Sequence, residues 1–299
     1  MKPAPFEYLR PDSVGEALHL LAQTPGARVL AGGQSLVPLM NFRHAQPSHL
    51  IDINRLAELD YLHDAGSCLA IGAMTRQRTV EYSSLAAARL PLVVAAVCRL
   101  GHRQTRNRGT VGGSLSYMDP AAELALMACI QDGELVLCSQ RHGERTLSMA
   151  AFALGPHRSA LEADELLTEV RLVPWPAGHG WGFHEFSRRH SDGASATAAV
   201  LRTRDPAGHI DRVAVAIGAV ENLPPRRLHR IEARLLGQKP GCALFTGATA
   251  DLAGELQPHD DAAAPAWYRA HMAQVLVHRA LGDAARRAAA TAAQPGTPP

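Results

Sequence analysis

The chain has very little lysine and no paired cysteines, and each scarcity excludes a class of site. Lysine occurs only at Lys2 and Lys239, so a phosphate-binding loop that ends in Gly-Lys-Ser/Thr is absent. The five cysteines stand singly, without a Cys-x-x-Cys pair, which excludes an iron-sulfur cluster or a structural zinc site. Several lie in apolar runs, so we expect buried thiols at Cys68, Cys98, Cys129, Cys138 and Cys242.

The sequence also lacks strong charge and long apolar runs. A formal net charge of +2 over 299 residues is too small for the basic footprint of a nucleic-acid-binding protein. No stretch reaches the roughly 20 apolar residues that a membrane-spanning helix needs. The first residues contain Pro, Glu and Asp where a signal peptide has a basic end and an apolar run. We therefore expect a cytoplasmic protein with no membrane span and no nucleic-acid partner.

The chain is long enough for two folded domains, with 46% hydrophobic and 19% charged residues. Residues 1–57 show the order strand, helix, strand, helix, strand. Residues 58–176 continue with helices and with strand patterns in ELVLCS, ERTLSM and LLTEVRLVPW, which we assign to one sheet. These two subdomains make up a first domain over residues 1–176.

Residues 177–285 show a different pattern and are assigned to a second domain. Three strand-like segments, GFHEFSRR, ATAAVLRTR and HIDRVAVAIGAV, precede mostly helical sequence from Arg226. This order predicts a smaller α+β domain in which helices pack on a three-stranded antiparallel sheet. The Ala- and Pro-rich residues 286–299 are expected to be disordered. The fold class is therefore α+β.

Two glycine turns are the first candidates for a ligand site. The first lies between a strand and a helix, where glycines let the backbone approach a ligand and free amides favour an anion such as a dinucleotide pyrophosphate. An ordinary strand-to-helix turn would use glycines too. The second turn offers the same chemistry in the next subdomain, so the two could approach one pyrophosphate from opposite sides. Neither is a Gly-x-Gly-x-x-Gly motif. The turns comprise Ala31, Gly32, Gly33, Gln34 and Ser35, and Thr110, Val111, Gly112, Gly113 and Ser114.

Acidic residues follow the second turn. Asp119 and Glu123 stand at i and i+4 on the predicted helix, so both side chains would share a face and accept hydrogen bonds from sugar or ribityl hydroxyls. Capping of the helix by Asp119 and solvation of Glu123 are the alternatives. Basic side chains from His102 to Arg108, and Arg188 with Arg189, would serve a solvated loop, a cofactor or a partner subunit. The only compact metal candidate, His259-Asp260-Asp261, is expected to be solvated or capping.

Four separated motifs resemble one known family. AGGQSLVPLMNFR followed by HLIDINRL, then RNRGTVGGSLSYMDPAAELA, DELLTEVRL and FSRRHSDGASATAAV, are similar in order and spacing to the FAD-binding medium subunit of the xanthine dehydrogenase and carbon monoxide dehydrogenase family. The similarity extends over about residues 3–285.

The resemblance implies a two-subdomain FAD-binding fold like that of vanillyl-alcohol oxidase, followed by the smaller domain, with FAD between them. It implies that the turn from Val29 and Leu30 to Leu36 and the turn from Thr110 to Ser114 hold the pyrophosphate. It further implies an acidic contact at Glu123 and an apolar contact at Leu167. At His184 some relatives carry a lysine that contacts the cofactor, so this chain departs from the family there.

The resemblance also implies partners. A large subunit would carry the molybdenum cofactor and a small subunit would carry two [2Fe-2S] clusters, in a dimer of heterotrimers. This chain would pass electrons through FAD to an external acceptor. Two other functions stay open: a self-sufficient flavin oxidase or dehydrogenase of the same fold, and a nonenzymatic scaffold that has lost FAD.

Overall fold

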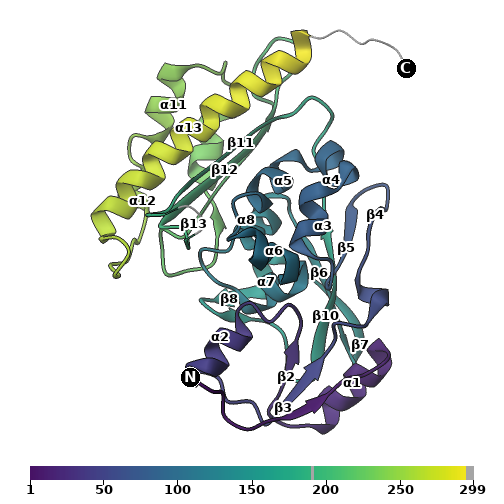
Figure 1. Cartoon of the computed structure of the whole chain (residues 1–299). Coiled ribbons are helices and arrows are strands. Elements are labelled where there is room, and N and C mark those ends of the chain that lie inside the picture. Colours follow the sequence, from purple (N-terminus) through teal and green to yellow (C-terminus); the bar gives the residue numbers. More distant parts are fainter. Residues whose placement is uncertain (190–191, 294–299) are drawn as a thin grey trace. The chain divides into compact units, whose positions relative to one another are not determined.

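The structure is a computed structural model that describes residues 1–189 and 192–293, with side chains described up to residue 288. It divides into two compact units (Figure 1). The first unit comprises residues 1–87, 101–118 and 132–173, and the second comprises residues 88–100, 119–131 and 174–299. The helical segments 88–100 and 119–131 thus belong with the second unit, although they precede the domain boundary that we predict at residue 176.

The first unit begins with a parallel three-stranded sheet in the order β1-β3-β2. Ser13 caps the first helix by accepting a hydrogen bond from the Glu16 amide at 3.1 Å. The apolar side of that helix, with Ala17 and Leu21, packs on Ile51 of the central strand. The elements are β1 (Glu7–Leu9), α1 (Val14–Gln23), β2 (Ala27–Leu30), α2 (Leu36–Asn41) and β3 (His49–Asp52), in the order that the sequence predicts.

An antiparallel five-stranded sheet, β4-β5-β10-β6-β7, forms the other part of the first unit. The three strands predicted over residues 134–175 are β6, β7 and β10, and they do share this sheet. Its strands are β4 (Leu62–Asp64), β5 (Leu69–Gly72), β6 (Glu134–Ser139), β7 (Gly143–Ser148) and β10 (Glu165–Leu172). The remaining elements are η1 (Ala57–Leu59), α3 (Gln77–Tyr82), α6 (Arg103–Arg108), α7 (Val111–Tyr117), α9 (Met149–Phe152), β8 (Ala153–Gly155) and β9 (Arg158–Ser159); α4 (Ser84–Arg89) runs across the boundary between the units.

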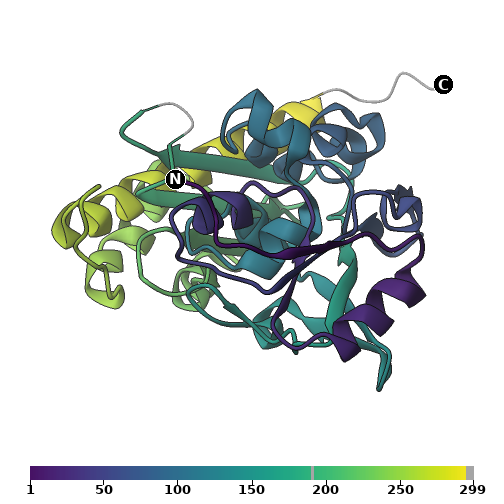
Figure 2. The same ribbon diagram turned by 60° about the horizontal axis from the view of Figure 1, so that its bottom comes forward.

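The second unit is built on an antiparallel sheet in the order β11-β12-β13-β14. The long helix α13 lies along one face of this sheet (Figures 1 and 2). The helix packs closely on β11 because Gly180 and Gly182 have no side chain. Ideal Cβ atoms at these two positions would lie only 1.9 and 2.1 Å from carbonyl oxygens of α13. The elements are α5 (Pro91–Val97), α8 (Glu123–Ile130), β11 (Gly180–Phe186), β12 (Ala196–Thr203), β13 (Arg212–Gly218), β14 (Arg226–Arg227), α10 (His229–Leu235), α11 (Cys242–Thr249), α12 (Leu252–Glu255) and α13 (Ala266–Ala293).

The opposite face of that sheet is also buried. Ala199, Leu201, Ala214 and Ala216 are fully buried there, and α8 contacts β12 and β13. Because successive residues of a strand point to opposite faces, the neighbours His184 and Glu185 of β11 serve different sides of the sheet.

Two predictions for the C-terminal part differ from the structure. The sheet has a fourth, two-residue strand, β14, where we predict the start of helical sequence, because Arg226 pairs with Ile217 of β13. In addition, α13 runs to Ala293, so residues 286–293 are helical rather than disordered. Alanine has the highest intrinsic helix propensity and extends a helix that is already anchored. Residues 294–299 of the predicted tail lie outside the described residues.

Candidate functional site

The first glycine turn connects β2 to α2 and leaves its backbone amides unused. Gly33 has a φ of +73°, a left-handed conformation that glycine adopts without steric cost. The side chain of Gln34 folds back and donates a hydrogen bond to the Gly32 carbonyl at 3.3 Å. Within the described part of the chain, the four amides from Gly32 to Ser35 donate no hydrogen bond. These amides are therefore available to an anion.

The second glycine turn differs from the first, because its amides from Val111 to Ser114 are already bonded. Val111 and Gly112 donate to the carbonyls of Thr75 and Ala73 at 3.0 and 2.8 Å. The next two amides donate to Thr110, from Gly113 to its hydroxyl at 3.0 Å and from Ser114 to its carbonyl at 3.2 Å. The expectation that this turn repeats the free amides of the first is wrong. An ideal Cβ at Gly112 would lie 2.5 Å from Ala73 Cβ, so its glycine serves close packing.

The two turns meet directly within the first unit. An ideal Cβ at Gly32 would lie 2.2 Å from the carbonyl oxygen of Arg108, two residues before the second turn begins. An ideal Cβ at Gly113 would lie 3.6 Å from Ala31 Cβ. The structure thus brings together the two segments that the sequence marked separately. They form a single backbone junction, to which, among the described residues, the first turn contributes four consecutive free amides and the second turn only that of Thr110.

A polar network that the sequence analysis missed surrounds this junction. Asn54 donates from Nδ2 to the Ala31 carbonyl at 2.8 Å, and Asp52 accepts from the Asn54 side chain at 2.5 Å. Arg76 donates to Asn54 Oδ1 at 2.7 Å and to the Arg108 carbonyl at 2.5 Å. The usable signal was the position of Asp52 and Asn54 at the carboxyl end of a parallel strand, where open α/β sheets place ligand contacts.

Asp52 is held as a carboxylate. Burial pushes its pKa upward, but hydrogen bonds from the Tyr8 hydroxyl and from Asn54, together with the charge of Arg108, lower the pKa below its ordinary value. An ionised Asp52 fixes the amide of Asn54, and Asn54 in turn fixes the first glycine turn.

Leu167 lies in the same unit, on strand β10. Its side chain is buried, and the pairing of β10 with β6 shifts register between Leu167 and Glu169. The carbonyl of Thr168 at this irregularity accepts from the Ala73 amide at 2.8 Å, and Ala73 accepts from Gly112. Leu167 therefore directly precedes Thr168, which is hydrogen-bonded to Ala73, and Ala73 in turn is hydrogen-bonded to Gly112 of the second turn.

Asp119 and Glu123 belong to the second unit, and the predicted shared helix face is wrong. Helix α8 begins only at Glu123. Asp119 lies in a preceding turn, where its Oδ1 accepts from the Ala121 amide at 2.9 Å and its carbonyl accepts from Ala122 at 2.9 Å. Short acidic side chains favour such turns over helix interiors, which explains the difference. The side chain of Asp119 thus acts as a turn cap.

Glu123 is buried, and burial raises its pKa to about 8, with a further increase from the charge of Glu185. Glu185 of β11 was not predicted as a site residue. Burial raises the pKa of Glu185 to about 7, although the charge of Arg99 lowers it. Its Oε2 atom is buried and has no hydrogen-bond partner among the described residues. The second unit therefore holds two neighbouring carboxyl groups, of which Glu123 is mainly neutral at neutral pH.

His184 lies on the other face of the sheet, toward α13. Its Nε2 atom is 3.2 Å from Asp283 Oδ2 of that helix. Burial lowers the pKa of His184, while Asp283 acts in the opposite direction. The side chain is thus engaged within the second unit. Of the basic run after β11, Arg188 and Arg189 are exposed, and residues 190–191 lie outside the described residues.

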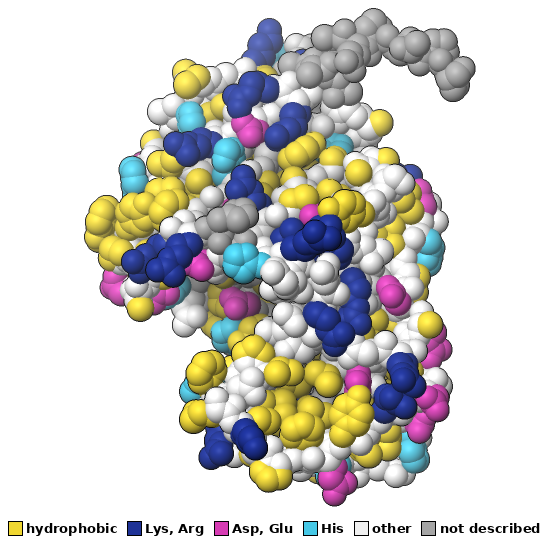
Figure 3. Space-filling view, viewed as in Figure 1, with side chains coloured by type: hydrophobic (Ala, Val, Ile, Leu, Met, Phe, Trp, Pro, Cys, Tyr) yellow, Lys and Arg dark blue, Asp and Glu magenta, His cyan; other side chains and the backbone are white. Residues whose placement is uncertain are grey.

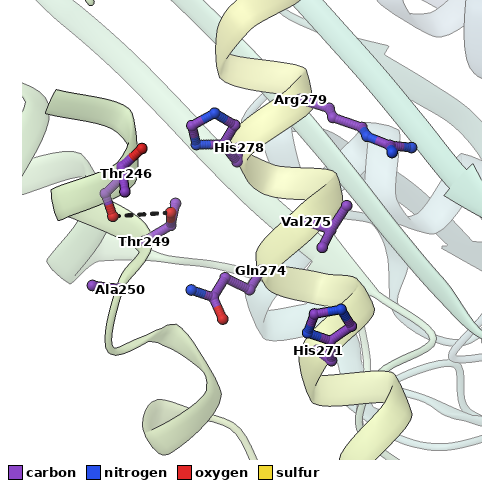
Figure 4. Close-up of a pocket in the computed structure, with 8 residues that line it drawn as sticks. All are labelled: Thr246, Thr249, Ala250, His271, Gln274, Val275, His278 and Arg279. Carbon is purple, nitrogen blue, oxygen red and sulfur yellow. Dashed lines mark hydrogen bonds between the residues drawn. The ribbon is translucent and has the colours of Figure 1, made fainter. Parts of the chain in front are cut away.

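A groove of about 410 Å³ lies between α11 and α13 (Figure 4). His271, Gln274 and His278 project into it from α13, opposite Thr246 and Thr249 of α11. None of the predicted site residues lines this groove. Apolar side chains are visible on the surface of the first unit (Figure 3), and its exposed large apolar residues include Phe6, Tyr8, Val37 and Phe42.

Metal and thiol predictions have mixed outcomes. Among the residues described, no group of three or more His, Cys, Asp or Glu side chains is arranged to hold a metal ion. Asp260 and Asp261 instead accept backbone amides of Ala266, Ala263 and Ala264, which supports the capping interpretation. The expectation of buried thiols is wrong for Cys98 and Cys242, which are exposed, and the other three are partly buried. No helix in the described ranges is long and apolar enough to cross a membrane.

Comparison with known proteins identifies similar chains over nearly the full length. Residues 4–176 match the family described as the FAD binding domain in molybdopterin dehydrogenase, and residues 181–284 match the CO dehydrogenase flavoprotein C-terminal domain. The chain is 37% identical to the carbon monoxide dehydrogenase medium chain of Hydrogenophaga pseudoflava, over 97% of this chain and 100% of that protein. It is 36% identical to the caffeine dehydrogenase subunit beta of Pseudomonas sp. strain CBB1, over 96% of this chain and 97% of that protein.

Solved structures are similar to the same extent. A chain of carbon monoxide dehydrogenase from Hydrogenophaga pseudoflava aligns with a TM-score of 0.91 at 37% identity, over 96% of this chain and 99% of that chain. A chain of quinoline 2-oxidoreductase from Pseudomonas putida 86 aligns with a TM-score of 0.91 at 31% identity, over 96% of this chain and 99% of that chain.

Proposed function

The chain belongs to the FAD-binding subunits of molybdenum hydroxylases, the family of the carbon monoxide dehydrogenase medium chains, and on this basis we propose that it is the electron-transfer subunit of such an enzyme. FAD is its cofactor, and the enzyme is an oxidoreductase. In the proposed role the chain accepts electrons from [2Fe-2S] clusters of a partner subunit and passes them to an external acceptor. Bound FAD supplies the redox chemistry, because a flavin takes up electrons singly or in pairs.

The observation that carries the proposal is the junction of the two glycine turns. Four consecutive amides, from Gly32 to Ser35, have no hydrogen-bond partner among the described residues, while the second turn packs against the first through the Arg108 carbonyl. Backbone amides without partners fit the diphosphate of a dinucleotide. In this proposal the first turn binds the diphosphate, and the second turn, from Thr110 to Ser114, fixes its position.

Other residues fit the sugar-like parts of FAD. A carboxyl group that stays protonated both donates and accepts a hydrogen bond, so a neutral Glu123 suits a ribityl or ribose hydroxyl. The unpartnered Oε2 atom of Glu185 offers a further acceptor in the same unit. Leu167 would supply an apolar contact near the flavin. Asp119 would act indirectly, by capping the turn that leads into α8 and Glu123. We keep His184 as a candidate contact only, because Asp283 already binds its ring.

The finer architecture and the partners are part of the proposal. We propose a two-subdomain FAD-binding fold of the vanillyl-alcohol oxidase type over residues 1–176, with a C-terminal flavoprotein domain over residues 177–285. We propose that a molybdenum-bearing large subunit and a [2Fe-2S] small subunit bind the chain, in a dimer of heterotrimers. Several similar proteins carry names such as "medium chain" or "subunit beta", which is in keeping with a multi-subunit enzyme.

The proposal is tested by purifying the full chain alone and titrating it with FAD. We expect saturable binding with a rise in melting temperature, and no turnover of substrates without the partner subunits. Substrate oxidation by the isolated chain would instead support a self-sufficient flavin enzyme. A folded chain that binds no FAD, alone or with its partners, would support the scaffold and contradict the proposal.

A further inference from the structure

We propose that Arg76 is the residue that neutralises the FAD diphosphate at the junction of the two glycine turns. This inference rests on the proposed function, because it assumes that the diphosphate occupies this junction. It concerns a side chain that lies outside both turns, more than 30 residues from each along the chain.

Arg76 is hydrogen-bonded to residues that adjoin the two turns. Its backbone lies opposite Thr110 in an isolated antiparallel bridge, so it is fixed beside the start of the second turn. Its Nη1 donates to the Arg108 carbonyl at 2.5 Å, and the same oxygen is the closest neighbour of Gly32. Its Nη2 donates to Asn54 Oδ1 at 2.7 Å, and Asn54 binds the Ala31 carbonyl at 2.8 Å. The guanidinium therefore lies two hydrogen bonds from the first turn, and it binds the carbonyl of Arg108, two residues before the second turn.

The positive charge of Arg76 has no carboxylate partner among the described residues. Its two hydrogen-bond acceptors are a backbone carbonyl and a neutral amide. The half-buried position and the charge of Arg108 lower its pKa, whereas Asp60 and Asp52 act in the opposite direction without hydrogen-bonding to it. Two other partly buried arginines of this unit do form ion pairs: Arg106 binds Glu81 at 2.8 Å and Arg145 binds Glu165 at 2.7 Å. A partly desolvated cation without an anion is costly unless a ligand supplies the anion.

Arg76 also retains donors for such a ligand. A guanidinium has five N–H donors, and the hydrogen bonds of Arg76 to Arg108 and Asn54 use two of them. The need for this cation follows from the rest of the junction. Four amides of the second turn, from Val111 to Ser114, already donate to Ala73, Thr75 and Thr110, and the chain has lysine only at its positions 2 and 239. The cations beside the junction are therefore arginines, the exposed Arg108 and the half-buried Arg76, and a guanidinium is well suited to bind phosphate oxygens.

The test compares ligands that differ in phosphate. The full chain is titrated with FAD, with ADP and with riboflavin, which lacks phosphate, in the wild type and in Arg76→Met, Arg76→Lys and Arg55→Met. Arg55 is exposed and adjoins Asn54, so it is a matched control for general surface charge. We expect Arg76→Met to lower the affinity for FAD and for ADP by about 10- to 100-fold, since a charged hydrogen bond contributes about 1.5–3 kcal/mol. Riboflavin affinity should stay within about twofold of the wild type, and Arg55→Met should change all three affinities by less than about threefold.

The lysine variant separates charge from bracing. Lysine keeps the charge but cannot bind Asn54 and Arg108 in the fork that arginine uses, so it should retain most of the preference for FAD over riboflavin. Equal losses for FAD and riboflavin in the methionine and lysine variants would show that Arg76 is only a structural brace, and unchanged FAD affinity in Arg76→Met would show that it carries no role; both outcomes overturn the proposal. If Arg76→Met does not fold, Arg76→Gln, which removes the charge but keeps hydrogen-bond donors, takes its place: a loss of FAD affinity in Arg76→Gln but not in Arg76→Lys supports the proposal, and wild-type FAD affinity in both overturns it. A wild-type chain that binds riboflavin but not FAD overturns the diphosphate site itself, and one that binds no flavin overturns the proposed function as well.

Discussion

Replacement of Gly32 by alanine should separate the two glycine turns. The added Cβ would lie 2.2 Å from the Arg108 carbonyl oxygen, 2.8 Å from its carbon and 2.9 Å from Gly109 Cα. Real Cβ contacts stay above 3.0 Å, so the 108–109 backbone must move by at least 0.8 Å relative to Gly32. No flexible side chain is available to absorb the shift, because all three obstructing atoms belong to the backbone. The same carbonyl accepts from Arg76, so this hydrogen bond is strained too.

The expected cost follows from overpacking. Inserting a methyl group into a closely packed region costs about 1–3 kcal/mol. We expect the unfolding free energy of the FAD-free chain to fall within this range, and FAD affinity to fall by about 10- to 100-fold because the junction is displaced from its binding geometry. Gly241→Ala is the control: Gly241 has an extended backbone and nothing within 4 Å of an ideal Cβ, so both quantities should stay close to the wild type.

Thermal or urea denaturation and FAD titration of the same preparations measure both effects. A Gly32→Ala chain with wild-type stability and wild-type FAD affinity would refute the junction. A chain that loses stability but binds FAD normally would refute the link between the junction and the diphosphate.

Three further predictions concern the remaining site residues. Burial raises the pKa of Glu123 to about 8 from an ordinary 4.5, so the folded state binds an extra proton and wild-type stability falls as pH rises from about 4.5 to 8. Glu123→Gln should remove this dependence, so that the variant no longer loses the about 1–3 kcal/mol of unfolding free energy that the wild type loses between pH 4.5 and pH 8. An unchanged pH profile of unfolding would contradict the burial argument. Asn54→Ala removes the hydrogen bond to the Ala31 carbonyl, and it should lower FAD affinity about tenfold and the unfolding free energy by about 1 kcal/mol. Asn107→Ala, at an exposed position, should change neither quantity. Titration calorimetry measures the affinity and scanning calorimetry the stability. His184→Gln should remove the stability loss that the wild type shows as pH falls below about 6.5, because burial lowers the pKa of the folded histidine, and should leave FAD affinity unchanged; a large loss of affinity would restore His184 as a cofactor contact.

Patterns between neighbouring residues were sufficient to predict the elements of residues 1–57 and the longer strands of both antiparallel sheets. The alternation of apolar residues and the cap at Ser13 locate β1 to β3 and their helices, because these signals act within one turn or one strand. The glycine turns were found for the same reason. The length of α13 and the strand β14 were missed because tertiary packing of α13 on β11 and pairing with β13 determine them.

The chemistry of the site was less accessible because its partners lie far apart in the sequence. Whether the amides of Val111 and Gly112 are free depends on Thr75 and Ala73, which no local pattern connects to them. Arg76 became a candidate only when its side chain was found between Asn54 and the Arg108 carbonyl. Glu185 looks like an ordinary strand residue until its burial beside Glu123 is known.

The central claim is that this chain acts as the FAD-bound electron-transfer subunit of a molybdenum hydroxylase. The most direct test purifies the native complex through a tag on this chain and assays FAD, molybdenum and iron in the same sample. We predict that FAD, molybdenum and iron co-purify in constant proportion with this chain and two further subunits. Recovery of the chain without flavin, or with flavin but without molybdenum and iron, would contradict the claim.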